Sequence, residues 1–365
     1  MANFYASKEW VILFPPDVPE IKKAAEDLSQ YIGLLAGLAD GIVQKPPALM
    51  DAHGPEPSDG LPLIVLNCDG SGPERNGFSW RMGPERVEIY GESGRGLCNG
   101  IYSLLAALGL NWPAPGESIL PASQVANLRV YPLSTADTGA GSAAGNVFAP
   151  SAYAGNGPAA APWKRFAVPA GKKEQQYIFK KSDVFVAWAA RRCYDALIFP
   201  LAAFASRSSG RKLEELRKSA AEYGISLEAG GRELSTLVPR KFFLLHRDFF
   251  RMDEGRRKTD HHFCPTNPGA IGLIAKEGAK LFRAAVQAKV FHLWPDKGAD
   301  KAWCSCPTCR AFTPAEQNRI AANAAADILA EVNPDASLTF SEKPDEGGSI
   351  PLRHTLFMME KLPDE

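Results

Sequence analysis

The 365-residue sequence predicts an α/β protein: a small α+β domain over residues 1–130, followed by a (β/α)8-type barrel domain over residues 131–365. Three observations lead to this prediction. A chain of this length holds about two domains of ordinary size. Helical and strand patterns alternate through the C-terminal part, as in a parallel sheet covered by helices. Between the two parts, residues 134–162 are rich in Ala, Gly, Ser and Pro, which is typical of a connecting segment.

The N-terminal part reads as strand, helix, strand, hairpin and helix. Apolar residues recur every three or four positions at Ile21, Ala24, Leu28, Ile32 and Leu35, which predicts a helix. Residues 46–60 are rich in Pro, Gly and Asp and predict a loop. The expected elements lie at residues 10–15, 18–38, 63–66, 78–82 with 87–90, and 97–108. Gly94-Arg95-Gly96 precedes the last helix, and since no Gly-Lys-Ser/Thr follows, helix packing explains it better than phosphate binding.

The C-terminal part predicts repeated helix and strand units. Helices are expected at residues 182–193, 212–223, 269–285 and 315–332, and strands at residues 196–200, 225–229, 290–294 and 337–340. Two further strands near 131–138 and 355–359 would bring the count to about six. A complete (β/α)8 barrel has eight, so the sequence predicts an irregular barrel or part of one.

Composition excludes several classes of protein. The hydrophobic fraction of 45% and the charged fraction of 22% are those of a globular chain. Lys plus Arg and Asp plus Glu both number 41, so no overall field attracts nucleic acid or a membrane, and a carbohydrate is the expected partner. The N-terminus lacks a basic segment followed by an apolar one, which predicts a cytoplasmic protein as written, or an exported one if a leader was removed.

Three cysteines crowd into six positions as Cys304-x-Cys306-x-x-Cys309. Cys264, from the preceding unit, could complete a tetrahedral set of four sulfur ligands, which predicts a structural zinc site. Two alternatives remain open: disulfides if the protein is exported, and buried thiols without metal. A nucleic-acid zinc ribbon is disfavoured because it would need paired Cys-x-x-Cys knuckles and a basic surface.

Two carboxylates follow predicted strands at the edge where barrel enzymes place catalytic groups. Asp296 follows the strand at 290–294 and is the candidate general acid/base, with Trp294 as a sugar-stacking face. Glu342 follows the strand at 337–340 and is the candidate partner carboxylate. The alternative interpretations are that Asp296 caps a turn after Pro295 and that Glu342 is a solvated loop residue.

Further candidates for substrate binding follow the strand at 225–229. Gly230 and Gly231 would allow a ligand close to the backbone, and Arg232, beside Glu233, could bind a sugar carboxylate bidentately. A tight turn with a surface ion pair explains the same residues. His262 could hydrogen-bond sugar hydroxyls, although a loop histidine is more often simply exposed.

Several motifs resemble known families. Residues 94–116, from Gly94-Arg95-Gly96 to Asn111-Trp112-Pro113-Ala114-Pro115-Gly116, resemble the accessory domain that precedes the barrel in family 20 hexosaminidases and α-glucuronidases. Three later motifs resemble a bacterial family called domain of unknown function 4838. They are Glu228-Ala229-Gly230-Gly231-Arg232-Glu233, Phe263-Cys264-Pro265-Thr266-Asn267-Pro268, and Leu293-Trp294-Pro295-Asp296 with the cysteine cluster. That cluster also resembles the zinc site of family 42 β-galactosidases.

These resemblances imply a glycoside-hydrolase-like protein that acts on a poly- or oligosaccharide, with Glu233 and Asn267 among its substrate-binding residues. The chain departs from the family pattern at Arg232, where His is expected, and at Lys297 after Trp-Pro-Asp. The alternative is therefore a non-catalytic carbohydrate-binding protein with a structural zinc site.

Overall fold

The computed structural model describes residues 10–40, 48–54, 61–68, 76–83, 85–120, 164–169, 171–296, 303–340 and 349–351. It divides into two compact units. The first consists of Met1–Phe166, Tyr177–Ala196 and Glu215–Ser226, and the second of Ala167–Gln176, Leu197–Glu214 and Leu227–Glu365. The predicted domain boundary at residue 130 lies outside the described residues, so it stays a prediction. No described helix is long and apolar enough to cross a membrane.

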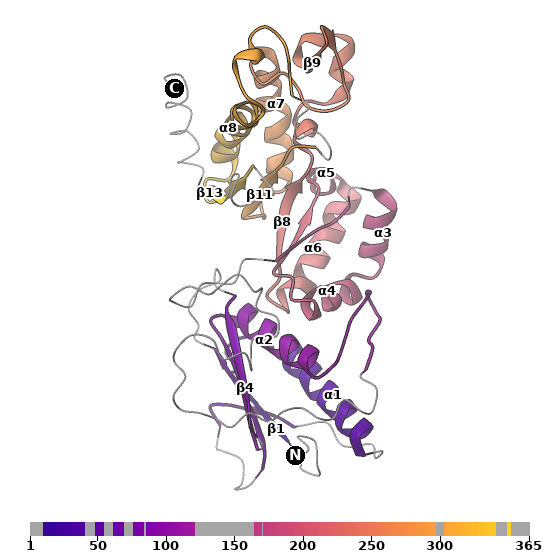
Figure 1. Ribbon diagram of the computed structural model, residues 1–365, viewed down its shortest axis with the longest axis vertical. Helices are drawn as coiled ribbons and strands as arrows, with labels where there is room; N and C mark the ends of the chain where they lie inside the picture. Colours follow the sequence, from indigo (N-terminus) through magenta and orange to yellow (C-terminus); the bar gives the residue numbers. More distant parts are fainter. Residues whose placement is uncertain are drawn as a thin grey trace. The chain divides into compact units, whose positions relative to one another are not determined.

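The first unit contains a five-stranded sheet in the order β2-β1-β3-β5-β4 (Figure 1). Its strands are β1 (Val11–Phe14), β2 (Ala48–Asp51), β3 (Leu63–Cys68), β4 (Phe78–Met82) and β5 (Arg86–Gly91). Neighbours pair in parallel, except that β4 and β5 form the predicted antiparallel hairpin. The prediction that residues 46–60 form a loop is wrong for residues 48–51, which form the strand β2. Only the two central residues of this edge strand are partly buried, and its backbone pairing with β1 has no signature in the sequence.

Two helices accompany this sheet, α1 (Ile21–Asp40) and α2 (Gly94–Ala107), as predicted. Ser93 caps α2 by accepting a hydrogen bond from the Gly96 amide at 3.0 Å. A Cβ atom at Gly96 would lie 2.5 Å from the Gly77 carbonyl oxygen, so only glycine permits this close approach. The Gly-rich segment therefore serves helix packing.

A buried carboxylate organises the polar interior of the first unit. Asp195 follows α4 (Ser182–Arg191) and is 1% exposed. It accepts hydrogen bonds from the side-chain amides of Asn76 (2.8 Å) and Asn99 (2.9 Å), from the Lys164 backbone amide (2.8 Å) and from Arg95 (3.4 Å). Arg95 also donates to the carbonyls of residues 190 and 223. One carboxylate thus satisfies donors from segments far apart in sequence.

A six-stranded sheet in the order β13-β12-β11-β8-β7-β6 forms the framework of the second half of the chain. Its strands are β6 (Arg165–Ala167), β7 (Ala196–Phe199), β8 (Ser226–Gly231), β11 (Val290–Leu293), β12 (Ser337–Thr339) and β13 (Ser349–Pro351). β11 pairs in parallel with β8 and β12, and β13 is antiparallel to β12. The α/β class is confirmed. The predicted strands near 131–138 and 355–359 lie outside the described residues, and the described strands do not close a barrel.

Helices connect these strands: α3 (Lys172–Lys180), α5 (Leu201–Ala205), α6 (Arg207–Ala221), α7 (Pro268–Ala284) and α8 (Pro314–Val332). α7 begins after the N-cap Asn267, and α8 begins after the N-cap Thr313, which forms a capping box with Glu316. In both helices the residue after the N-cap is Pro. Between β8 and α7 lie the short helices η1 (Leu234–Leu237), η2 (Arg240–Leu244) and η3 (Arg247–Phe249), then the hairpin of β9 (Met252–Asp253) and β10 (Arg256–Arg257). η4 (Cys309–Ala311) precedes α8.

Replacing Asp195 with Ala should lower the free energy of unfolding by about 3–5 kcal/mol, because Arg95 would stay buried without its carboxylate partner. Urea unfolding of the full chain, followed by circular dichroism, measures this change. The exposed Glu222→Ala is the control and should remain within about 0.5 kcal/mol of wild type. A loss below about 1 kcal/mol for Asp195→Ala would show that the carboxylate does not organise this unit.

Candidate functional site

The site begins where β8 and β11 come together. Gly230 lies opposite His292 in their parallel register, and its φ is +110°. A Cβ atom at Gly230 would lie 2.0 Å from the His292 carbonyl oxygen. The glycine predicted to let a ligand approach the backbone thus has the β11 backbone as its close neighbour, and this contact aligns the two strand ends.

The loops that leave these strands are tied together by hydrogen bonds. The Trp294 amide donates to the Gly231 carbonyl at 2.9 Å, and the Leu234 amide donates to the Trp294 carbonyl at 3.2 Å. The Ser235 amide then donates to the Asp296 carboxylate at 3.2 Å. These bonds bring Glu233, which follows β8, into the neighbourhood of Asp296, which follows β11.

Glu233 is a carboxyl group in an unusual environment. One oxygen accepts a hydrogen bond from the Leu201 amide at 2.6 Å, just after β7. Burial raises the pKa of Glu233 to about 7, the negative charge of Asp296 adds to this rise, and the Leu201 hydrogen bond opposes it. A carboxyl group of this kind can hold and release a proton near neutral pH.

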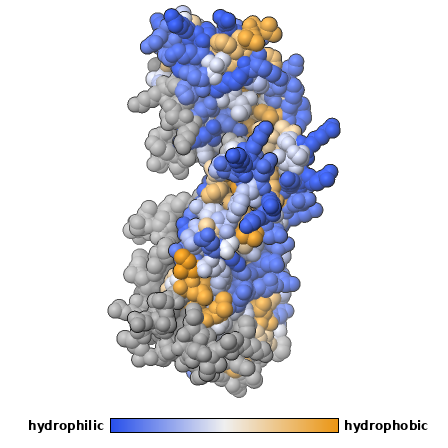
Figure 2. Space-filling view, turned by 90° about the vertical axis from the view of Figure 1, so that its right-hand side faces the viewer, coloured by the Kyte–Doolittle hydropathy of each residue, from blue (hydrophilic) through white to orange (hydrophobic). Residues whose placement is uncertain are grey.

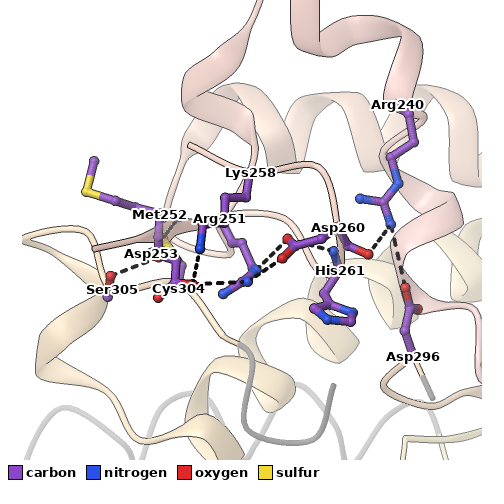
Figure 3. A network of polar contacts seen from close by, with 10 residues as sticks. All are labelled: Arg240, Arg251, Met252, Asp253, Lys258, Asp260, His261, Asp296, Cys304 and Ser305. Atoms are coloured by element: carbon purple, nitrogen blue, oxygen red, sulfur yellow. Dashed lines mark hydrogen bonds and ion pairs between the residues drawn. The ribbon is translucent and has the colours of Figure 1, made fainter. Parts of the chain in front are cut away.

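Asp296 is half-buried and has a cationic neighbour. Its carboxylate lies 3.8 Å from the Arg240 guanidinium, which also donates to the Asp260 carbonyl at 3.3 Å (Figure 3). The predicted position of Asp296 after β11 is confirmed, whereas its catalytic role stays a prediction. Its carboxylate also accepts a hydrogen bond from the Ser235 amide of the neighbouring loop. The predicted turn after Pro295 continues into residues 297–302, which lie outside the described residues, so that alternative stays a prediction.

The other predicted sugar-contacting residues lie in varied surroundings. Trp294 is 7% exposed, and its indole donates to the Thr339 hydroxyl at 3.0 Å. Arg232 is exposed. Glu342 lies outside the described residues. The substrate-binding roles of Trp294 and Arg232 and the catalytic role of Glu342 stay predictions.

Two more candidates have clear structural roles. His262 is fully buried and stacks on Trp303, with ring centroids 4.3 Å apart. Asn267 caps α7 through its side-chain oxygen, and its amide donates to the Asp248 carboxylate at 2.8 Å. These contacts give both residues a structural role, and their substrate-binding roles stay predictions.

A buried polar network beside the carboxylates was not predicted. His292 lies on β11 between Glu228 of β8, 2.7 Å from Nε2, and Thr339 of β12, 2.5 Å from Nδ1. All three side chains are buried. A signal was available, since Glu228 and His292 interrupt otherwise apolar strands, and buried polar side chains need partners.

The four predicted cysteines come together, which confirms their clustering. Their sulfur atoms all lie within 4.8 Å of one another, and all four residues are buried. The Cys264 sulfur lies 3.7 Å from that of Cys306 and 3.6 Å from that of Cys309. A disulfide needs about 2.05 Å, so these are free thiols. Sulfurs about 2.3 Å from a tetrahedral zinc ion would be about 3.8 Å apart, so the cluster fits such a metal.

Hydrogen-bond donors surround the cluster. The Met252 amide donates to the Cys304 sulfur at 3.2 Å, and Arg257 lies 3.8 Å from the same atom. Hydrogen bonds from the thiols of Cys304 and Cys309 hold the pKa of Cys264 well below its usual range.

The buried amide of Gln317, on α8, holds the cysteine loop in shape. It accepts from the Cys304 amide at 3.0 Å and donates to the carbonyls of Cys304 and Cys309, each at 3.1 Å. Sequence reasoning missed Gln317 because an isolated glutamine on a helix carries no local signal.

No protein-family model and no curated protein matches the chain. Similar solved structures include a GH138 enzyme targeting pectin rhamnogalacturonan II (10% identity, 89% of this chain, 42% of that chain, TM-score 0.48). They also include the GH20 β-N-acetylhexosaminidase of Streptomyces coelicolor A3(2) (12% identity, 91% of this chain, 61% of that chain, TM-score 0.41). A third is a chitobiase of Flavobacterium johnsoniae (12% identity, 91% of this chain, 49% of that chain, TM-score 0.44). The chain spans about half the length of these proteins. The resemblance to domain of unknown function 4838 stays a prediction.

Glu233 should make stability fall as pH rises. Its folded pKa of about 7 exceeds its ordinary value of 4.5, so the folded protein retains a proton that the unfolded chain releases between these values. The free energy of unfolding therefore falls by about 3 kcal/mol as the pH rises from 4.5 to about 7, and it stays lower above pH 7. The variant Glu233→Gln stays neutral and can still accept a hydrogen bond from the Leu201 amide. Its free energy of unfolding, relative to that of wild type, should therefore rise by about 3 kcal/mol between pH 4 and pH 8.

Urea unfolding of both proteins across this pH range measures the difference. The exposed Glu222→Gln is the matched control and should follow wild type at each pH. A stability difference between Glu233→Gln and wild type that does not change with pH would contradict the raised pKa.

Proposed function

We propose that the chain is a carbohydrate-active protein in which Glu233 and Asp296 are the paired carboxyl groups of a glycoside-hydrolase-type site. One observation carries the proposal: the two groups follow adjacent parallel strands, their loops are tied together, and burial beside Asp296 raises the pKa of Glu233 to about 7. Carboxyl groups at strand ends with separated proton affinities are the pattern of glycosidic acid/base catalysis. The sequence resemblances point to the same chemistry.

In this proposal Glu233 is the general acid. Its proton passes to the glycosidic oxygen as the bond from that oxygen to the anomeric carbon breaks. The Asp296 carboxylate, oriented by the Ser235 amide and Arg240, stabilises the positive charge that develops on the sugar ring. A water molecule supplies hydroxide to the anomeric carbon and its remaining proton restores the acid. The sequence predicted Asp296 as the group that transfers the proton. The burial and raised pKa of Glu233 instead support Glu233 in that role.

We also propose that Cys264, Cys304, Cys306 and Cys309 hold a structural zinc ion. Four buried sulfurs, with two spacings close to the edge of a zinc–thiolate tetrahedron, support this assignment. Four protein ligands would close the coordination sphere, so the ion would stabilise the fold and would not activate water. Its contribution would be to fix the cysteine loop against the β9–β10 hairpin.

Glu233→Gln should lower kcat on a hydrolysed glycoside by about 10²–10⁴-fold, because proton donation to the leaving group is lost. In wild type, kcat/KM should fall as pH rises above about 7, where Glu233 loses its proton. The measurement is hydrolysis of a panel of aryl glycosides and natural oligosaccharides, including hexosamines and uronic acids. Asp296→Asn should also be inactive, and Glu222→Gln should be unaffected.

Two results would contradict the enzyme proposal. One is hydrolysis by Glu233→Gln at the wild-type rate across pH. The other is no hydrolysis of any sugar while one of them raises the melting temperature. That second result would instead support a non-catalytic carbohydrate-binding protein.

The purified chain should contain about one zinc ion per molecule, and a chelator should lower its melting temperature because binding energy is also folding energy. Elemental analysis and thermal unfolding measure these two effects. Cys306→Ser should lose the metal, whereas Cys68→Ser, at a cysteine outside the cluster, should retain it. A stable chain that lacks metal after purification in zinc would show that the cluster is only a set of buried thiols.

A further inference from the structure

The loop from residue 240 to residue 249 is anchored by its own hydrogen bonds and by aromatic side chains. It consists of the turns η2 and η3, and the His246 amide donates back to the Phe242 carbonyl at 2.8 Å. Phe242, Phe243 and Phe249 pack partly against the hydrophobic core of the second unit. The aromatic residues thus hold the base of the loop and leave its tip outside the core.

Two leucines form this tip. Leu244 is 83% exposed and Leu245 is 82% exposed, and the next most exposed large apolar side chain in the described residues, Ile119, is 53% exposed. The face of the molecule drawn in Figure 2 is mostly hydrophilic, with apolar residues gathered in separate areas. Among the described residues, nothing covers these two adjacent leucines, which indicates a surface for binding.

Cationic side chains flank the leucines. The Lys241 ammonium lies 5.1 Å from the Phe242 ring centroid, and the Arg247 guanidinium lies 5.7 Å from that of Phe243. Both cations are exposed. The acidic residue of the tip, Asp248, accepts a hydrogen bond from the Asn267 amide. Asp248 is exposed as well, but Arg240, Lys241 and Arg247 outnumber it within residues 240–249. The tip therefore combines apolar surface with an excess of cationic side chains, although the chain as a whole has no net charge.

The size and charge of the tip select one kind of partner. In a symmetric dimer, the same cations would face one another across the two-fold axis, which is unfavourable. A stable protein interface needs about 800 Å² on each partner, far more than two side chains on a convex turn provide. An anionic bilayer has neither problem. Its charge is opposite to that of the tip, and it needs no large matching protein surface, because apolar side chains can enter its interface while Lys and Arg remain at the headgroups.

We infer that the loop carrying Leu244 and Leu245 docks the protein on the surface of an anionic lipid bilayer. The two leucines enter the headgroup boundary, and Lys241 and Arg247 contact the lipid phosphates. The inference does not depend on the proposed hydrolase activity, since no residue of the Glu233 and Asp296 pair takes part.

The test is co-sedimentation of the full chain with vesicles of phosphatidylglycerol or phosphatidylcholine. We expect partition onto phosphatidylglycerol to exceed that onto phosphatidylcholine at least tenfold, and to weaken at high salt. The double variant Leu244→Ser and Leu245→Ser should lose at least tenfold in partition. Leu34→Ser, at an exposed leucine on α1, is the matched control and should bind like wild type.

Three results would overturn the inference. They are equal binding of the double variant and wild type, equal binding to the two lipids, and no binding to either lipid. Analytical ultracentrifugation adds another decisive readout: a wild-type dimer that becomes a monomer in the double variant would assign the leucines to a second copy of the chain. Circular dichroism of the double variant checks that it is folded, as expected for surface substitutions.

Discussion

The close approach of β8 and β11 at Gly230 is the constraint on which the candidate site depends. Since any side chain at this position would collide with the His292 carbonyl, only glycine allows the two strands to pair in this register. A slip of one residue would turn every side chain of β8 to the other face of the sheet. The register therefore decides that Glu228 and His292 meet inside, and that the loop of Glu233 emerges beside the loop of Asp296.

The buried network links three strands through polar side chains. The Trp294 indole can only donate, so the Thr339 hydroxyl accepts from it. The same hydroxyl contacts Nδ1 of His292, and Nε2 of His292 contacts the Glu228 carboxyl group. This network fixes the side chain of Trp294, whose backbone joins the two site loops. Polar groups buried at some cost thus help to orient the paired carboxyls.

Most of the fold could be predicted because its helices and buried strands have strong apolar patterns. Asp296 and the cysteines were found because a strand end and a ligand spacing are local signals. Other features depend on register between distant segments: Glu228 and His292 are 64 positions apart, and only strand pairing shows that they meet. Glu233 was predicted to bind substrate, but its raised pKa was likewise hidden, because that pKa depends on burial and on Asp296.

Figure 3 shows polar contacts that connect the surroundings of Cys304, a member of the cysteine cluster, with Asp296. The Met252 amide donates to Cys304, and the adjacent Arg251 holds the Asp260 carboxylate with bonds of 2.8 and 2.6 Å. The Asp260 carbonyl in turn accepts a hydrogen bond from Arg240, the cation beside Asp296. A metal that stiffens the hairpin would therefore restrict where Arg240 lies. Because Arg240 is partly exposed, its attraction for Asp296 is modest, and its contribution is orientation more than energy.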